Sequence, residues 1–194
     1  MDEARVLKSN YEIAMIRKAN MISSAAHTAV LHTLSTARNE ADLEATFAAT
    51  CISSLAKHQA YPIIAASGQN ASTLHYDTNN QSLLDRQLVV LDAGCEWDCY
   101  ASDITRTFPI SGTWSREARE IYAIVEEMQE ACIRLIKPGV IFRNLHMLAL
   151  SIAVKRLLEL GILHNGSFNE VFETGAVFFP HGVSSTFLFL IYLF

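Results

Sequence analysis

The segment from Gln87 to Phe108 constrains the fold of this chain more than any other part of the sequence. It opens with a continuous run of leucine and valine that ends at Asp92, a pattern typical of a buried strand. Polar residues follow, and residues 97–108 then alternate well enough to form an antiparallel partner strand. The sequence therefore predicts a β-hairpin with its turn near Trp97 and Asp98.

Two aspartates become neighbours in such a hairpin. With a turn at Trp97-Asp98, Asp92 and Asp103 lie directly opposite each other, with Cβ atoms about 4.5–5.5 Å apart. Buried carboxylates so close repel, and a divalent cation such as Mg, Ca or Mn between them would relieve that cost. Alternatively, the aspartates only cap turns of a solvated hairpin, because Asp is common before Gly in turns. A register one residue different would place them on opposite faces.

Helical patterns flank the hairpin on both sides. The first contains a capping box formed by Ser9 and Glu12, and Asn39 and Ser115 cap two others. Helices are expected over residues 10–35, 40–57, 116–135 and 143–160, and short strands over residues 61–66, 74–76 and 177–180. Helix pairs that cover a mostly antiparallel sheet define an α+β fold class.

Composition excludes several classes of protein. Of 194 residues, 51% are hydrophobic and 18% charged, which is a globular composition and not a disordered one. The net charge of −5 argues against nucleic-acid binding, which requires a basic face on the protein. Four cysteines without CxxC spacing and a polar segment over residues 1–10 favour reduced thiols and a cytoplasmic location. Cys95 and Cys99 beside the hairpin are alternative metal ligands, but thiolates are soft, so both are interpreted as packing residues.

Two histidines stand out among seven. His75 follows a polar loop in a Leu-His-Tyr strand pattern, and His181 ends the run Phe-Phe-Pro-His. Each of them, taken alone, fits a partly buried structural histidine at least as well as a catalytic one. No nucleophile elbow, phosphate-binding loop or zinc-finger spacing is present in the sequence.

Leu91-Asp92-Ala93-Gly94 followed by residues 100–109 (YASDITRTFP) resembles the metal-binding hairpin of the Xaa-Pro aminopeptidase and prolidase group. These are metallopeptidases with the pita-bread fold. Further matches in the same order cover residues 13–26, 68–76, 121–139 and 178–182. The resemblance extends over residues 8–182, which are expected to be a partial metallopeptidase catalytic domain with an incomplete second half. It is closest to fungal Xaa-Pro aminopeptidases.

The resemblance implies two divalent ions, most often Mn²⁺, held by two aspartates, one histidine and two glutamates. Asp92 and Asp103 match the two aspartates, His75 matches a histidine that lines the substrate pocket, and His181 matches a substrate-contacting histidine that is not a ligand. The implied reaction is release of an N-terminal residue that precedes proline, with proline-containing peptides as partners. Whether dipeptides or longer peptides are preferred, and whether the chain forms a homo-oligomer, stays open.

The sequence departs from the family after Gly182. The family continues with Leu-Gly-His, whose histidine is a metal ligand, whereas Val183-Ser184-Ser185 follow here, and no later histidine is present. Only two of the five ligands are therefore matched, which predicts an inactive chain. Residues 183–194 are interpreted as an aberrant apolar tail, because a splice-donor sequence read in frame encodes Val-Ser.

Other interpretations of the chain stay open. Residues 183–194 would also fit a buried terminal strand, and they are too few for a membrane span, which takes about 20 residues. Besides a metallo-aminopeptidase by descent, the alternatives are a non-catalytic pita-bread module that binds peptides or proteins and a fragment tethered to a membrane by its tail. Both aspartates argue against an old binding module, because unused buried carboxylates cost stability.

Overall fold

The computed structural model describes residues 6–84, 88–164 and 166–174, and the chain divides into two compact units, Met1–Trp114 and Ser115–Phe194. The strand expected at residues 177–180, His181 and the tail at residues 183–194 lie outside the described residues. Each unit is described by itself below. Among the described residues, no helix combines the length and the hydrophobicity needed to cross a bilayer.

Two capped helices open the first unit, as the sequence predicts. Helix α2 (Asn10–Thr33) begins at Ser9, whose hydroxyl accepts from the Glu12 amide while the Glu12 carboxylate accepts from the Ser9 amide at 2.6 Å. Helix α3 (Glu40–Ser53) begins at Asn39 with a second capping box. It ends before the predicted Lys57, because Leu55 adopts a left-handed φ of 70° that a helix cannot continue.

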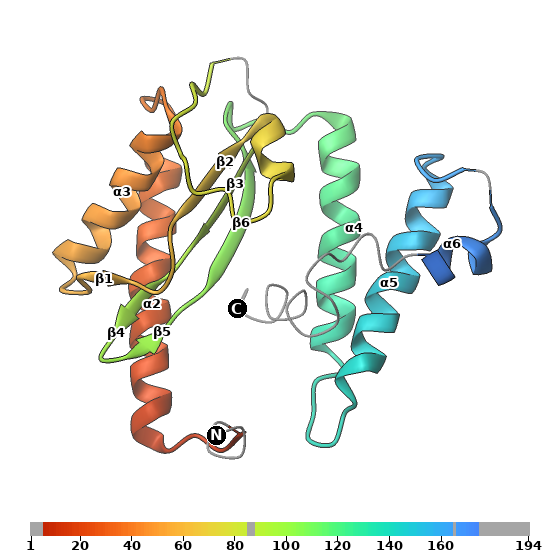
Figure 1. The fold of residues 1–194 in the computed structure, drawn as a ribbon, viewed down its shortest axis with the longest axis horizontal. Helices are drawn as coiled ribbons and strands as arrows, with labels where there is room; N and C mark the ends of the chain where they lie inside the picture. The colour runs from red at the N-terminus through yellow and green to blue at the C-terminus, as the bar shows by residue number, and fades with distance from the viewer. Residues whose placement is uncertain (1–5, 85–87, 165, 175–194) are drawn as a thin grey trace. The chain divides into compact units, whose positions relative to one another are not determined.

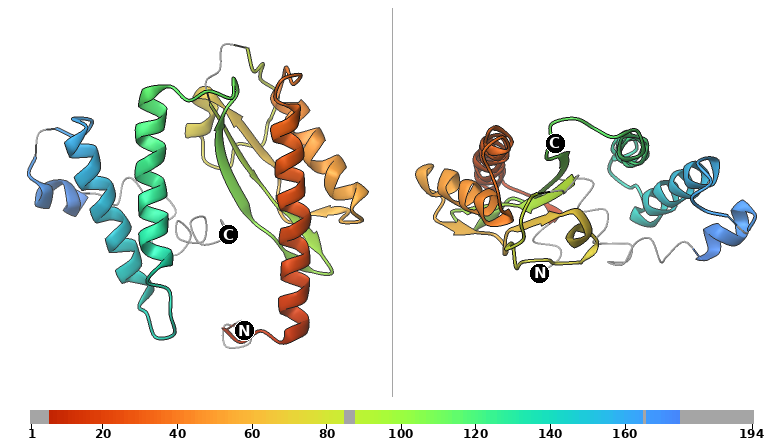
Figure 2. Two further views of the ribbon diagram at one scale, coloured as in Figure 1. Left: turned by 180° about the vertical axis from the view of Figure 1, so that it is seen from behind. Right: turned by 90° about the horizontal axis from the view of Figure 1, so that it is seen from above.

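Two small antiparallel sheets complete this unit (Figure 1). The larger has the order β2-β3-β6, with bounds Ile64–Ser67, Leu88–Ala93 and Ile104–Pro109. The smaller has the order β1-β4-β5, with bounds His58–Gln59, Cys95–Trp97 and Tyr100–Ala101. Both helices cover one face of the larger sheet (Figure 2), where their side chains bury alternate residues of β3, namely Val89, Leu91 and Ala93. Asp92 therefore lies on the opposite face.

The predicted register of the hairpin is wrong by two residues. Strands β3 and β6 pair Asp92 with Thr105 and not with Asp103. The reason is that the turn is centred one residue later than predicted, at Asp98 and Cys99, whose φ angles of 50° and 67° suit a tight hairpin turn. A shift of two residues preserves the face of every side chain, so Asp92 and Asp103 remain on the same side as diagonal neighbours.

The strand expected at residues 74–76 is also wrong. A 3₁₀ helix, η1 (Gly68–Ser72), is followed by a turn at Leu74 and His75, and the φ of His75 is 53°. A strand needs extended backbone, which this left-handed residue interrupts. The strand expected at residues 61–66 begins only at Ile64, so Tyr61 stands before β2.

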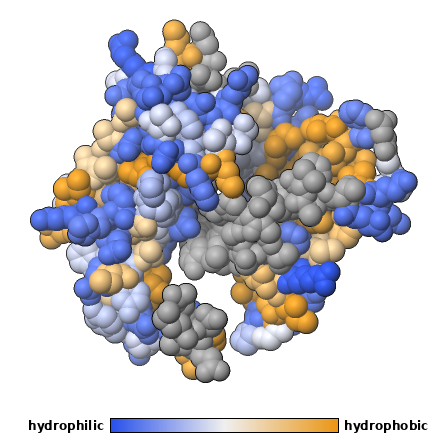
Figure 3. Space-filling view, viewed as in Figure 1, coloured by the Kyte–Doolittle hydropathy of each residue, from blue (hydrophilic) through white to orange (hydrophobic). Residues whose placement is uncertain are grey.

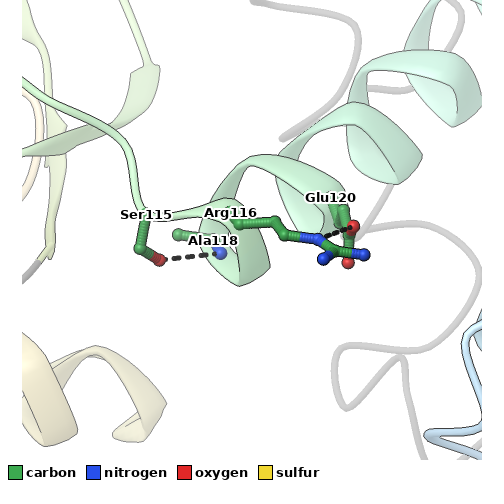
Figure 4. A network of polar contacts seen from close by, with 4 residues as sticks. All are labelled: Ser115, Arg116, Ala118 and Glu120. Carbon is green, nitrogen blue, oxygen red and sulfur yellow. Dashed lines mark hydrogen bonds and ion pairs between the residues drawn. The ribbon is translucent and has the colours of Figure 1, made fainter.

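The second unit is helical, with α4 (Arg116–Ile133), α5 (Phe142–Glu159) and α6 (Phe168–Thr174). Helix α4 begins at Ser115, whose hydroxyl accepts from the Ala118 amide at 3.1 Å, and Arg116 pairs with Glu120 at 3.0 Å (Figure 4). The buried stripe Ile124, Met128 and Cys132 of α4 packs in one cluster with α5.

Hydrophobic residues at the two ends of α4 are only partly buried. Ile121 near its start and Leu135 just beyond its end are 39% and 48% exposed, so the cluster with α5 uses the middle of the helix. Hydrophobic residues accordingly show at the surface of this unit among hydrophilic ones (Figure 3). Helix α6 was not predicted, although Ser167 and Glu170 form a local cap at its start.

Candidate metal centre

The site is built at the point where the two small sheets meet along the hairpin. Asp92 is the residue before the last one of β3 and is 4% exposed, and Asp103 stands just before β6. Gly94 lies against the backbone of Ser102, because a Cβ there would stand 1.8 Å from the Ser102 carbonyl oxygen. Only glycine allows the two strands to approach this closely, so Gly94 serves close packing, and the turn of the hairpin lies further on, at Asp98 and Cys99.

Tyr61 joins the two aspartates. Its hydroxyl oxygen lies 2.7 Å from Asp92 Oδ1 and 2.8 Å from Asp103 Oδ1. The structure therefore brings together the two predicted ligands, as the diagonal register requires, and adds a residue that the sequence analysis missed. Only a weak signal in the sequence points to Tyr61: it precedes a proline at the entry to the strand that pairs with β3.

The electrostatics of the three groups favour a positive charge. Burial raises the pKa of Asp92 to about 6, the hydrogen bond from Tyr61 acts against this rise, and the negative charge of Asp103 adds to it. Burial and the aspartates also raise the pKa of Tyr61, which keeps the phenol neutral. One phenolic proton serves only one carboxylate at a time, so the other contact requires a proton or a cation.

His75 lies in the turn that follows η1 and not in the predicted strand. The charge of His75 lowers the pKa of the Asp92 carboxyl, and it is the smallest of the influences on that group. His181 lies outside the described residues. The cysteines near the hairpin behave differently from each other: Cys95 is fully buried, as a packing residue should be, whereas Cys99 is exposed in the turn, so its interpretation as a packing residue is wrong.

The donor set fits a hard divalent cation in part. Asp92 and Asp103 present carboxylate oxygens on one face, and oxygen ligands suit Mg, Ca and Mn. Within the part of the chain that the structure describes, however, no group of three or more His, Cys, Asp and Glu side chains is placed to hold a metal. The described residues thus supply two carboxylates of a metal centre and not a complete ligand set.

Comparison of the sequence with known proteins points the same way. The model of metallopeptidase family M24 matches residues 14–186. Probable Xaa-Pro aminopeptidases from Sclerotinia sclerotiorum, Aspergillus niger and Chaetomium globosum are 54%, 56% and 57% identical to 94% of this chain. The chain covers 33%, 38% and 31% of these proteins, so it spans about a third of the length of the curated relatives it matches.

A solved structure also resembles the chain over most of its length. Zinc-substituted aminopeptidase P from Escherichia coli, in complex with product, superposes with a TM-score of 0.83 at 38% identity. The match covers 89% of this chain and 39% of the bacterial chain. The α+β fold expected from the sequence is therefore confirmed as part of a pita-bread domain.

Proposed function

The chain belongs to metallopeptidase family M24 and descends from Xaa-Pro aminopeptidases, and from this premise we propose that Asp92 and Asp103 are the two aspartate ligands of its metal centre. The observation that carries the proposal is the pair of carboxylates that share the Tyr61 hydroxyl at 2.7 and 2.8 Å. Such a pair is costly without a cation and is well suited to one. Mn²⁺ is the ion that we expect there.

The chemistry of the parent enzymes assigns a role to each side chain. A divalent cation lowers the pKa of bound water and stabilises a developing oxyanion, which serves hydrolysis of the peptide bond before proline. The carboxylates of Asp92 and Asp103 would hold the cation, and the hydroxyl of Tyr61 fixes the orientation of both carboxylates. To His75, which is exposed in its turn, and to His181 we assign contact with a proline-containing peptide.

For this chain by itself we expect weak cation binding and no peptide hydrolysis. Hard cations such as Ca²⁺ and Mg²⁺ take about six or more oxygen ligands, whereas the described residues supply two carboxylates. The alternative, a pita-bread module that binds peptides without catalysis, is favoured by the same incompleteness. Binding of a proline-containing peptide in the absence of any metal would distinguish it.

The test is a titration of the full chain with Mn²⁺. Free Mn²⁺ is counted by its electron paramagnetic resonance signal, and the melting temperature is measured over the same range, because an ion that binds only the native state raises it. We expect a shift at millimolar Mn²⁺ that is lost in Asp92→Asn and Asp103→Asn. Asp98→Asn, an exposed carboxylate in the same hairpin, is the matched control and should behave as the unmodified chain. A shift that survives Asp103→Asn would refute the assignment.

A further inference from the structure

One fully buried carboxylate takes no part in the metal centre. Glu40 is the first residue of α3, and none of its surface is exposed. Its Oε1 accepts hydrogen bonds from the Ser67 amide at 2.8 Å, the Ser67 hydroxyl at 2.6 Å and the Asn70 side chain at 3.0 Å. Its Oε2 accepts from the Tyr76 hydroxyl at 2.7 Å and the Gln81 amide at 3.0 Å.

These five donors keep the carboxylate ionised. Burial alone raises the pKa of Glu40, but the hydrogen bonds from Ser67, Tyr76 and Asn70 outweigh it and hold the pKa below its ordinary value. All five donors are neutral groups, and the position in the first turn of α3 adds the favourable end of the helix dipole. The buried negative charge of Glu40 therefore fixes the position of the segment that supplies the donors.

All the donors belong to one segment, residues 67–81, which carries His75. The Tyr76 hydroxyl is the donor adjacent to that histidine in sequence, and the Glu40 amide returns a hydrogen bond to the Gln81 carbonyl at 2.9 Å. A second anchor lies nearby: the Asn79 side chain bonds the Ala65 amide at 2.8 Å and the Ile63 carbonyl at 2.7 Å. The segment is thus tied to α3 and β2 on both sides of His75.

The backbone of His75 needs such anchors. Its φ of 53° lies in the left-handed region, which a residue with a Cβ rarely adopts unless surrounding contacts impose it. The same holds for Asn79, whose φ is 43°. A loop released from Glu40 would relax towards extended or right-handed backbone and would move the imidazole of His75 from its place in the structure.

We propose that Glu40 is the positioning residue for His75: its buried carboxylate gathers residues 67–81 and thereby holds the left-handed backbone that sets where the imidazole lies. The inference rests on the proposed function, because the place of His75 matters chemically only beside a metal centre. Glu40 itself contacts neither aspartate ligand in any hydrogen bond of the described residues and acts through the loop.

The test compares Glu40→Gln with Asp42→Asn in the full chain without metal. Glutamine keeps the size of the side chain but replaces one carboxylate oxygen by an NH₂ group. This group cannot accept the hydrogen bonds that are donated on that side. Asp42 lies in the same turn of α3, and its carboxylate accepts from the Arg38 and Asn39 amides, so its replacement weakens the helix start without removing a bond to the loop. The readouts are native-state hydrogen exchange and the backbone ¹³C shifts of His75, which report its left-handed φ.

In Glu40→Gln, the Ser67 and Gln81 amides should exchange about tenfold faster or more relative to the amides of β3, and the His75 shifts should move to values for ordinary backbone. Asp42→Asn should change the exchange rates of all these amides by the same factor and leave the backbone shifts of His75 unchanged. A merely structural role for Glu40 predicts uniform acceleration instead. Unchanged His75 shifts in a folded Glu40→Gln chain would overturn the proposal.

If Glu40→Gln does not fold, Tyr76→Phe decides the matter, because it removes the donor next to His75, together with the bond from the Asn70 side chain to that hydroxyl, and leaves the four other donors to Glu40. The His75 shifts should then move while the Ser67 amide stays protected, and constant shifts would refute the proposal. Substoichiometric Mn²⁺ adds an independent readout, since a paramagnetic ion at the aspartates broadens nearby ring signals. Absence of broadening in the unmodified chain counts against the metal centre, and the metal-free exchange data still decide the role of Glu40.

Discussion

Replacement of Gly94 by alanine tests the closest backbone approach in the site. The added Cβ would stand 1.8 Å from the Ser102 carbonyl oxygen and 2.5 Å from its carbonyl carbon. Ordinary contact begins at 3.4 Å, so the two strands would have to separate by more than one ångström. The obstacle is backbone and not the end of a flexible side chain, so rotation of a side chain cannot relieve it.

The cost follows from what that separation breaks. The Ser102 amide donates to the Cys95 carbonyl at 3.0 Å and the Ala60 amide to the Gly94 carbonyl at 2.9 Å, and both bonds lie across the displaced backbone. Each contributes about 1 kcal/mol, and overpacking of a tight contact adds about 1–3 kcal/mol. We expect the free energy of unfolding to fall by about 3 kcal/mol or more, and Asp103 to move away from the Tyr61 hydroxyl.

Urea denaturation followed by tryptophan fluorescence measures this loss. Both tryptophans, Trp97 and Trp114, lie in the first unit, so the signal reports on the part of the chain that contains the site. Gly112→Ala is the matched control: nothing lies within 4 Å of its added Cβ, and only its φ of 74° opposes alanine, at about 1–2 kcal/mol. If Gly94→Ala costs no more than Gly112→Ala, the close approach does not govern the hairpin.

Three further outcomes are expected. Tyr61→Phe should lower the free energy of unfolding by about 2 kcal/mol, because it removes the hydroxyl that Asp92 and Asp103 share; an unchanged urea midpoint would contradict this. Burial lowers the pKa of His27 to about 4, so protonation favours the unfolded chain and stability is lost as the pH falls from about 6.5 towards 4. Urea curves of His27→Gln at both ends of that range should lack this component, which is up to about 3 kcal/mol in the unmodified chain. Ser9→Ala should cost about 1 kcal/mol by loss of the capping box, measured by thermal unfolding, and no loss would show that this helix end is stabilised otherwise.

Local patterns predicted much of the fold. The caps at Ser9, Asn39 and Ser115 all stand where the sequence places them, because a capping side chain bonds amides only two or three residues away. The apolar run that ends at Asp92 is a buried strand for a similar reason, since the run consists of consecutive residues and can be read directly from the sequence. Helix ends were less accurate, as α3 shows, because a single left-handed residue terminates it.

The candidate site was predicted in its chemistry but not in its geometry. Asp92 and Asp103 share a face in any register that differs by an even number of residues, so the pairing of the two carboxylates survived an error in the turn. Tyr61 was missed because it lies 42 residues from Asp103, and no periodicity connects them. The turn at His75 was missed because its conformation depends on a carboxylate 35 residues earlier in the chain.

The sequence by itself determined the helices α2, α3, α4 and α5, the buried strand and the two carboxylates on one face, because these depend on interactions within a few residues or on a period of two. Only the tertiary structure decided the diagonal register, the phenol shared by Asp92 and Asp103, and the grip of Glu40 on residues 67–81. The physical reason is that each of these is a hydrogen bond or backbone contact between distant segments. Such contacts form only where the packed helices and strands bring the groups within about 3 Å of each other.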